Sequence, residues 1–186
     1  MMTIPNILTF ARVALIPILI ALLFLGGDLA RWGAFVLFGA LAFTDYLDGY
    51  LARKLNQQTD LGALIDPIAD KVLVAALIVA LVGSGDIAGW DIAGAILILS
   101  REFLVSGLRE FLAHRALAMP VTRLAKWKTT FQLVGIALYI LPPLPFAGQD
   151  ITTTLIWWIA TVLTLITGYD YLTTANRQLA ADKQGS

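Results

Sequence analysis

Apolar residues gather in six long windows along the chain, each near the length of a membrane-crossing helix. The windows are residues 7–25, 32–51, 63–82, 92–112, 129–144 and 151–172. A helix that crosses a bilayer needs about 20 mainly apolar residues. Clusters of glycine, aspartate and proline separate several windows: Gly26-Gly27-Asp28, Gly83-Ser84-Gly85-Asp86 and Pro142-Pro143. Because these residues are typical of turns, the pattern predicts an all-α integral membrane bundle of six transmembrane helices.

Composition agrees with a membrane location. Hydrophobic residues make up 59% of the 186 residues and charged residues 14%, which is too apolar for a soluble domain of this length. The formal net charge is zero, so no nucleic-acid partner is indicated. The chain has no cysteine, which excludes disulfides and thiolate metal sites. We expect one membrane domain over residues 1–176 and a polar, poorly ordered tail over residues 177–186.

The placement of lysine and arginine predicts the orientation, because cytoplasmic loops of membrane proteins are enriched in both. One side of a six-span arrangement carries Arg12, Arg53, Lys54, Arg109, Arg115, Arg123, Lys126, Lys128, Arg177 and Lys183. The other side carries Arg31 as its one basic residue. Both termini are therefore expected in the cytoplasm, with the connection between spans two and three. Near the expected outer ends, an aromatic belt is predicted from Trp32, Trp90, Trp157 and Trp158.

Four aspartates interrupt the second and third windows: Asp45, Asp48, Asp66 and Asp70. Charges in hydrocarbon are costly and need compensation. Residues three or four apart share one face of a helix, so two adjacent helices would present two carboxylate pairs to each other. Carboxylate oxygens suit Mg²⁺ or Mn²⁺, and two such ions are suited to a diphosphate. The four residues therefore predict a two-metal site.

Small residues and an arginine adjoin the aspartates. Gly49 and Ala52 leave room for a ligand to approach the helix backbone. Arg53 has the planar fork of donors that binds phosphate in a bidentate manner. This combination favours a nucleotide diphosphate as the ligand over a bare ion.

Structural alternatives exist for the carboxylates. Asp66 precedes Pro67, so it could be a helix N-cap with proline in the first turn. Asp45 and Asp48 could instead pair with Lys71 or Arg101 as intramembrane ions.

The residues around the aspartates form a recognisable pattern, D-x2-D-G-x2-A-R-x8-G-x3-D-x3-D. It is matched without mismatch by Asp45, Asp48, Gly49, Ala52, Arg53, Gly62, Asp66 and Asp70. The pattern resembles the signature of the CDP-alcohol phosphatidyltransferases, a family whose plan is also six helices with cytoplasmic termini.

The resemblance implies roles for these residues. Asp45, Asp48 and Asp66 would hold two ions, Mg²⁺ or Mn²⁺, with Asp70 close to the metals and acting as the general base. The CDP part of CDP-diacylglycerol would be contacted by Gly49, Ala52 and Arg53 with Gly62. Asn6, Thr9 and Arg12 resemble the N-x2-T-x2-R nucleotide-binding element of the family.

Two further stretches, residues 101–109 and 126–132, resemble the branch whose acceptor is glycerol 3-phosphate. An anionic acceptor needs additional cations, and the expected ones are Arg101, Arg109, Lys126 and Lys128. Arg101 lies near the middle of span four, so we expect it to have a partner such as Glu102, an aspartate or the substrate phosphate. The sequence departs from the branch at Ala125, where glycine is usual.

The resemblance implies transfer of a phosphatidyl group from CDP-diacylglycerol to glycerol 3-phosphate, with release of CMP. It implies a homodimer in a bacterial-type cytoplasmic (inner) membrane, with the active site facing the cytoplasm among membrane lipids. Three alternatives stay open: another acceptor such as serine or inositol phosphate, a membrane prenyltransferase, and an ion or proton transporter that uses its carboxylates as a relay.

Several isolated residues carry weaker signals. His114, the one histidine, is expected at the surface rather than in catalysis. Asp170 either shapes the site or belongs to a helix end. Four glycines are expected to permit close helix packing: Gly39, Gly94, Gly107 and Gly135.

Overall fold

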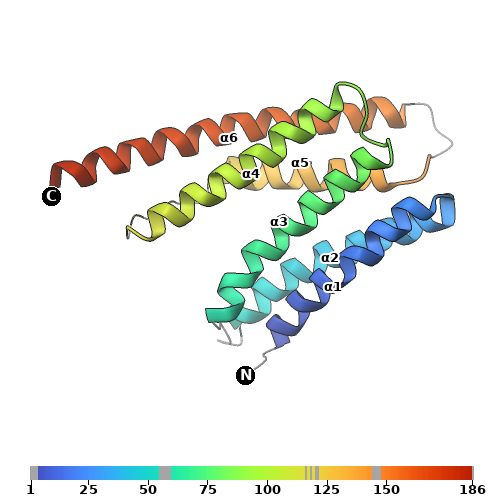
Figure 1. The fold of residues 1–186 in the computed structure, drawn as a ribbon, viewed down its shortest axis with the longest axis horizontal. Helices are drawn as coiled ribbons and strands as arrows, with labels where there is room; N and C mark the ends of the chain where they lie inside the picture. The colour runs from blue at the N-terminus through green and yellow to red at the C-terminus, as the bar shows by residue number, and fades with distance from the viewer. Residues whose placement is uncertain are drawn as a thin grey trace. The chain divides into compact units, whose positions relative to one another are not determined.

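Six α-helices make up the described part of the computed structural model, which contains no strand there (Figure 1). They are α1 (Ile4–Leu25), α2 (Asp28–Lys54), α3 (Asp60–Gly83), α4 (Asp91–Ala113), α5 (Arg123–Ile140) and α6 (Gln149–Gly185). The backbone is described for residues 4–54, 60–115, 117, 119, 122–143 and 148–185, and the side chains for 9–44, 65, 68–115, 117, 119, 122–143 and 148–182. The prediction of an all-α protein with six helices is confirmed.

Helix ends follow the turn residues of the sequence. Gly26 and Gly27 separate α1 from α2 with φ angles of 69° and 78°, in the left-handed region that favours glycine. α5 ends at Ile140, so the expected window over residues 129–144 is too long. Pro142 and Pro143 lack a backbone N–H and disfavour helical backbone before them, which ends the helix early.

One helix in the described part of the chain is long and apolar enough to cross a membrane, over Gln149–Asp182 of α6. In α1, the part with described side chains, Thr9–Leu25, is apolar as well. α4 has Arg101 and Glu102 near its middle, and these charges make it less apolar.

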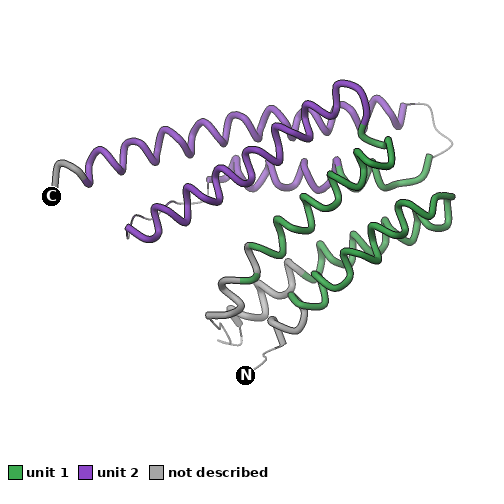
Figure 2. Tube along the Cα trace, viewed as in Figure 1, with its two compact units in different colours: residues 1–87, 136–147 green, residues 88–135, 148–186 purple. Residues whose placement is uncertain are grey.

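Contacts divide the chain into two compact units (Figure 2). Unit 1 comprises residues 1–87 and 136–147, and unit 2 comprises residues 88–135 and 148–186. In unit 1, α1 packs against both α2 and α3. Its core contains buried apolar side chains from all three helices, among them Leu19, Phe38 and Leu77. Where these side chains would be in contact with water in the unfolded chain, their burial is the main favourable contribution to the packing.

In unit 2, α4 packs against α6, and Trp157 of α6 is fully buried. Its indole N–H donates a hydrogen bond to the backbone oxygen of Asp91 at 3.0 Å. Trp158 donates to Asp91 Oδ1 at 2.8 Å. The expectation that Trp157 belongs to a lipid-facing belt is therefore wrong: its ring fills the interior of unit 2 while its polar nitrogen is satisfied at the start of α4.

Two of the four glycines expected at close helix contacts are found there. A Cβ on Gly94 would lie 2.7 Å from Trp157 Nε1, and one on Gly135 would lie 3.2 Å from Trp157 Cε3. Beyond the local helix backbone, nothing in the described part of the chain lies within 4 Å of a Cβ built on Gly39 or Gly107, so the packing prediction is wrong for these two there. Both close glycines face one large ring, because a tryptophan needs more room than any other side chain.

The C-terminal segment is helical. α6 continues through Gly185, so the expected polar tail is helical over residues 177–185. Its apolar positions recur every four residues, at Tyr171, Ala175 and Leu179, and pack with Val105 and Leu112 of α4 in one cluster. The apolar stripe of α6 therefore extends into a segment whose composition is polar.

Candidate active site

Two residues of the N-x2-T-x2-R element are buried on α1. Thr9 and Arg12 are each 1% exposed. Arg12 Nη1 donates a hydrogen bond to Asp70 Oδ1 at 2.8 Å, while the Asp70 side chain is 48% exposed. The structure therefore joins the arginine expected at the nucleotide to the aspartate expected as general base. Asn6, the first residue of the element, has its side chain outside the described residues.

The four aspartates lie on two helices, as the spacing predicts. α2 contains Asp45 and Asp48, and α3 contains Asp66 and Asp70. α3 begins at Asp60, so Asp66 lies inside the helix and is not its N-cap. The remaining signature side chains lie outside the described residues: Asp45, Asp48, Gly49, Ala52, Arg53, Gly62 and Asp66.

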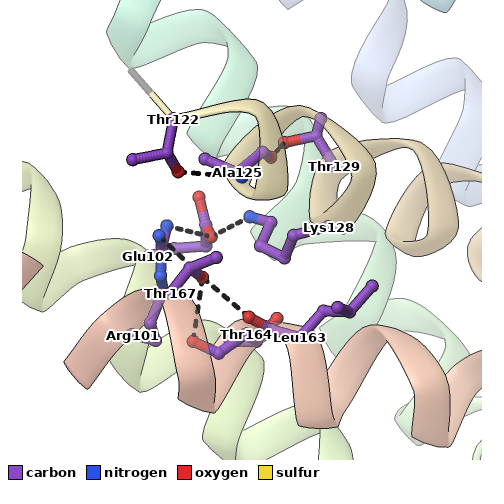
Figure 3. A network of polar contacts seen from close by, with 9 residues as sticks. All are labelled: Arg101, Glu102, Thr122, Ala125, Lys128, Thr129, Leu163, Thr164 and Thr167. Carbon is purple, nitrogen blue, oxygen red and sulfur yellow. Dashed lines mark hydrogen bonds and ion pairs between the residues drawn. The ribbon is translucent and has the colours of Figure 1, made fainter. Parts of the chain in front are cut away.

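Two of the four predicted acceptor cations meet at one carboxylate in unit 2 (Figure 3). Glu102 Oε1 accepts a hydrogen bond from Lys128 Nζ and another from Arg101 Nη1, the latter at 3.3 Å. Lys128 is 3% exposed and Arg101 11%. The prediction that Arg101 needs a partner, with Glu102 as one candidate, is confirmed by this ion pair.

Arg101 is also held by α6. Its Nη2 donates to Thr167 Oγ1 at 3.1 Å, and its Cζ lies 5.3 Å from the centre of the Tyr171 ring, within the range of a cation–π contact. A Cβ on Gly168 would lie 3.1 Å from Arg101 Cγ. The stem of Arg101 therefore lies directly on α6 where the chain has no side chain.

The other two predicted acceptor cations, Arg109 and Lys126, are exposed. Lys126 and Lys128 are two residues apart on α5 and so point to different faces of the helix. Lys128 is buried on α5, where the Glu102 carboxylate compensates its charge.

Buried polar atoms of unit 2 without a hydrogen-bond partner in the described part of the chain include Arg101 Nε, Gln132 Oε1 and Thr164 Oγ1. Gln132 is 2% exposed and Thr164 is fully buried. Buried polar groups are normally paired with protein, water or a ligand, so these atoms provide unused hydrogen-bonding capacity beside the Arg101–Glu102–Lys128 cluster.

A comparison with known sequences assigns these features to one family. The family model for CDP-alcohol phosphatidyltransferase matches residues 2–166. The chain belongs to the CDP-alcohol phosphatidyltransferase family. The match covers α1 to α5 and the first half of α6, including every residue of the aspartate signature. The family resemblance predicted from the motif is confirmed.

Similar bacterial proteins cover nearly the whole chain. A protein of Rickettsia bellii is 44% identical over 90% of this chain and 92% of its own length. One of Bacillus subtilis is 35% identical over 92% of this chain and 94% of its own. Both are named CDP-diacylglycerol–glycerol-3-phosphate 3-phosphatidyltransferase. A Mycobacterium tuberculosis protein, 36% identical over 96% of this chain and 84% of its own length, is named a probable phosphatidylglycerophosphate synthase.

Several residues in and around the Arg101–Glu102–Lys128 cluster were not predicted as site residues. Glu102 was expected only as a partner of Arg101, whereas Thr167, Gly168 and Gln132 had no assigned role. The spacing of Thr161, Thr164 and Thr167 on α6, all buried, was a usable signal, because hydroxyls three residues apart form a polar stripe on one helix face. His114 is exposed, as expected, and Asp170 is exposed as well.

Proposed function

We propose that the protein is a phosphatidylglycerophosphate synthase, which transfers the phosphatidyl group of CDP-diacylglycerol to the 1-hydroxyl of sn-glycerol 3-phosphate. The observation that carries the proposal is the complete aspartate signature in a chain whose relatives, aligned over about nine tenths of it, share this activity in their names. The products are phosphatidylglycerophosphate and CMP.

In the proposed reaction, the acceptor hydroxyl oxygen forms a bond to the phosphorus that bears the diacylglycerol. The bond from that phosphorus to the CMP oxygen breaks, and CMP leaves with the electron pair. Asp70 takes the hydroxyl proton as general base. Its contact with the buried Arg12 supports this role, because the guanidinium holds the carboxylate in one orientation.

The donor set fits divalent metal ions. Asp45, Asp48, Asp66 and Asp70 would hold two ions, Mg²⁺ or Mn²⁺, since carboxylate oxygens are the ligands these hard cations prefer. When bound, such ions supply charge neutralisation at the diphosphate and at the departing CMP. The half-exposed Asp70 side chain is compatible with a ligand role.

The nucleotide would be bound by residues of the N-x2-T-x2-R element and of the aspartate signature. They are Asn6, Thr9, Arg12, Gly49, Ala52, Arg53 and Gly62. Thr9 and Arg12 are three residues apart on α1 and so share one face of that helix, which supports a common part in nucleotide binding.

The acceptor phosphate would be bound by Arg101 and Lys128, with Arg109 and Lys126 as exposed cations that attract it. The support is the convergence of Arg101 and Lys128 on Glu102, together with unpaired polar atoms beside them. Serine, a zwitterion, would need fewer cations, which favours glycerol 3-phosphate. Family membership leaves neither the prenyltransferase nor the ion transporter as a supported alternative.

We further propose six membrane spans with both termini in the cytoplasm, in a bacterial cytoplasmic membrane, and a homodimer. Large apolar side chains are exposed on all six helices, as a lipid-facing surface requires. Examples are Ile18, Val36, Val79, Ile96, Val134 and Val162. An active site at the cytoplasmic boundary would let a water-soluble acceptor meet a lipid whose acyl chains stay in the bilayer.

The proposal is tested with purified protein, CDP-diacylglycerol in mixed micelles, Mg²⁺ and separate acceptors, following CMP release. Glycerol 3-phosphate is expected to support turnover, whereas serine and inositol phosphate are not. Preference for another alcohol would retain the family and overturn the acceptor. No CMP with any of them would overturn the activity.

A further inference from the structure

Glu102 joins two cations that come from different helices (Figure 3). One of its oxygens, Oε1, accepts from Lys128 of α5 and from Arg101 of α4. The side chain of Glu102 is 20% exposed. The three groups together carry two positive charges and one negative charge, so the cluster keeps a net positive charge for an anionic ligand.

The two cations depend on Glu102 to different degrees. Arg101 is also held by Thr167 and by the Tyr171 ring of α6. In the described part of the chain, Glu102 is the one hydrogen-bond partner of Lys128 Nζ. A buried cation whose carboxylate is removed loses its compensation and is repelled by its like-charged neighbour. The position of Lys128 therefore depends on Glu102.

Hydrogen-bonding capacity remains around the pair. An ammonium group has three donors and a guanidinium five, and the contacts with Glu102 and Thr167 leave some of them for a ligand. Gln132 lies one turn along α5 from Lys128, on the same face, and its Oε1 is buried without a partner in the described residues. A ligand that combines a phosphate with hydroxyl groups matches these donors and acceptors.

We propose that Glu102 is a positioning residue for the acceptor: through Lys128 it sets the cation pair that binds the phosphate of glycerol 3-phosphate. The inference rests on the proposed function. Glu102 is itself an anion and repels phosphate, so its effect on acceptor binding is indirect and favourable only through the cations that it holds.

The test is a double-variant cycle in the full-length protein, with Glu102→Gln, Lys128→Gln and both together. The matched control is Glu110→Gln, which removes an exposed carboxylate from the same helix. The KM for glycerol 3-phosphate, the KM for CDP-diacylglycerol and kcat are measured from CMP release. Glu102→Gln is expected to raise the acceptor KM at least about ten-fold, with kcat and the lipid KM within about two-fold of the control.

Because Glu102 acts through Lys128, the double variant is expected to match Lys128→Gln within about two-fold in the acceptor KM. An unchanged acceptor KM in Glu102→Gln would overturn the inference, and so would an equal rise in the KM values of both substrates. A double variant whose rise in acceptor KM equals the product of the two single rises would overturn it as well. If Glu102→Gln does not fold, the comparison of the double variant with Lys128→Gln decides, since neither has an unpaired Lys128 charge. Absence of turnover with glycerol 3-phosphate in the wild type and in Glu110→Gln would instead overturn the proposed function, and this inference with it.

Discussion

Arg12 of α1 donates a hydrogen bond from Nη1 to Oδ1 of Asp70 on α3, at 2.8 Å. The arginine is buried and the aspartate is half exposed. A guanidinium that is fixed by burial imposes its orientation on the carboxylate it binds, because the planar donor fork has few geometries available. The first helix therefore has a defined link to the aspartate proposed as general base.

Replacing Arg12 by methionine is expected to lower kcat/KM at least about ten-fold, because Asp70 loses the group that orients it. Arg115→Met is the matched control: Arg115 is an exposed arginine in a weak 3.7 Å ion pair with Asp182, and exposed pairs of this kind contribute little. Steady-state CMP release measures both. Equal activity of the two variants would contradict an orienting role for Arg12.

Asp70→Asn is expected to reduce kcat at least about 100-fold, because an amide cannot take the proton of the acceptor's hydroxyl group as a carboxylate does. Asp170→Asn, at an exposed position of α6, should retain wild-type turnover. Both are assayed with saturating substrates, so that a change in substrate affinity does not enter. Undiminished turnover in Asp70→Asn would exclude this residue as the base.

Removal of divalent metal is expected to abolish CMP release, because the charge on the diphosphate and on departing CMP would no longer be neutralised. Treatment with EDTA followed by addition of Mg²⁺ or Mn²⁺ should stop and then restore turnover. Direct binding is measured by Mn²⁺ electron paramagnetic resonance, in which Asp45→Asn should show weaker binding than the wild type. Full turnover in excess EDTA would contradict the two-metal proposal.

Gly168→Ala is expected to raise the KM for glycerol 3-phosphate about two- to ten-fold. The new Cβ would lie 3.1 Å from Arg101 Cγ, so the arginine stem must shift away from α6 and from Thr167. The control is Gly107→Ala, where the new methyl group meets nothing within 4 Å among the described residues outside the local helix backbone. An acceptor KM equal to that of the control would show that the contact of Arg101 with α6 has no part in acceptor binding.

Gly94→Ala is expected to destabilise the protein by about 1–3 kcal/mol through overpacking. Its Cβ would meet Trp157 Nε1 at 2.7 Å and Thr161 Oγ1 at 2.9 Å, and the buried ring has little room to move. Gly107→Ala should be neutral or slightly stabilising, since alanine is the better helix former. Thermal unfolding in detergent compares the two. A Tm for Gly94→Ala at or above that of Gly107→Ala would contradict the packing argument.

The helices and their ends could be predicted from local features. Apolar windows, paired glycines and the Pro142-Pro143 pair act over a few residues, so five of the six windows fall entirely inside observed helices. The exception is the window 129–144, which extends past Ile140. Its apolar content was counted, but the effect of proline on the residue before it was not. The motif likewise needed no tertiary structure, since it is a pattern of spacing within 26 consecutive positions of the sequence.

Contacts between distant segments could not be predicted in this way. Trp157 looks like an interfacial tryptophan by position, yet Gly94 and Gly135 make room for it inside unit 2. Gly39 and Gly107 have the same local chemistry, yet neither has a close neighbour from another helix among the described residues. Which glycine contacts a ring depends on the rotation and register of two packed helices. The sequence of one helix determines neither of these.

The same distinction holds for the site. Spacing alone paired the aspartates on α2 and α3 and identified the family, because a helix repeats every 3.6 residues and residue types determine which ligands can bind. The four predicted acceptor cations, equal by charge, are distinguished only by the fold: Arg101 and Lys128 turn inward to Glu102, while Arg109 and Lys126 face outward. Burial and partner depend on which helix faces are covered, and that is a property of the packed helices together.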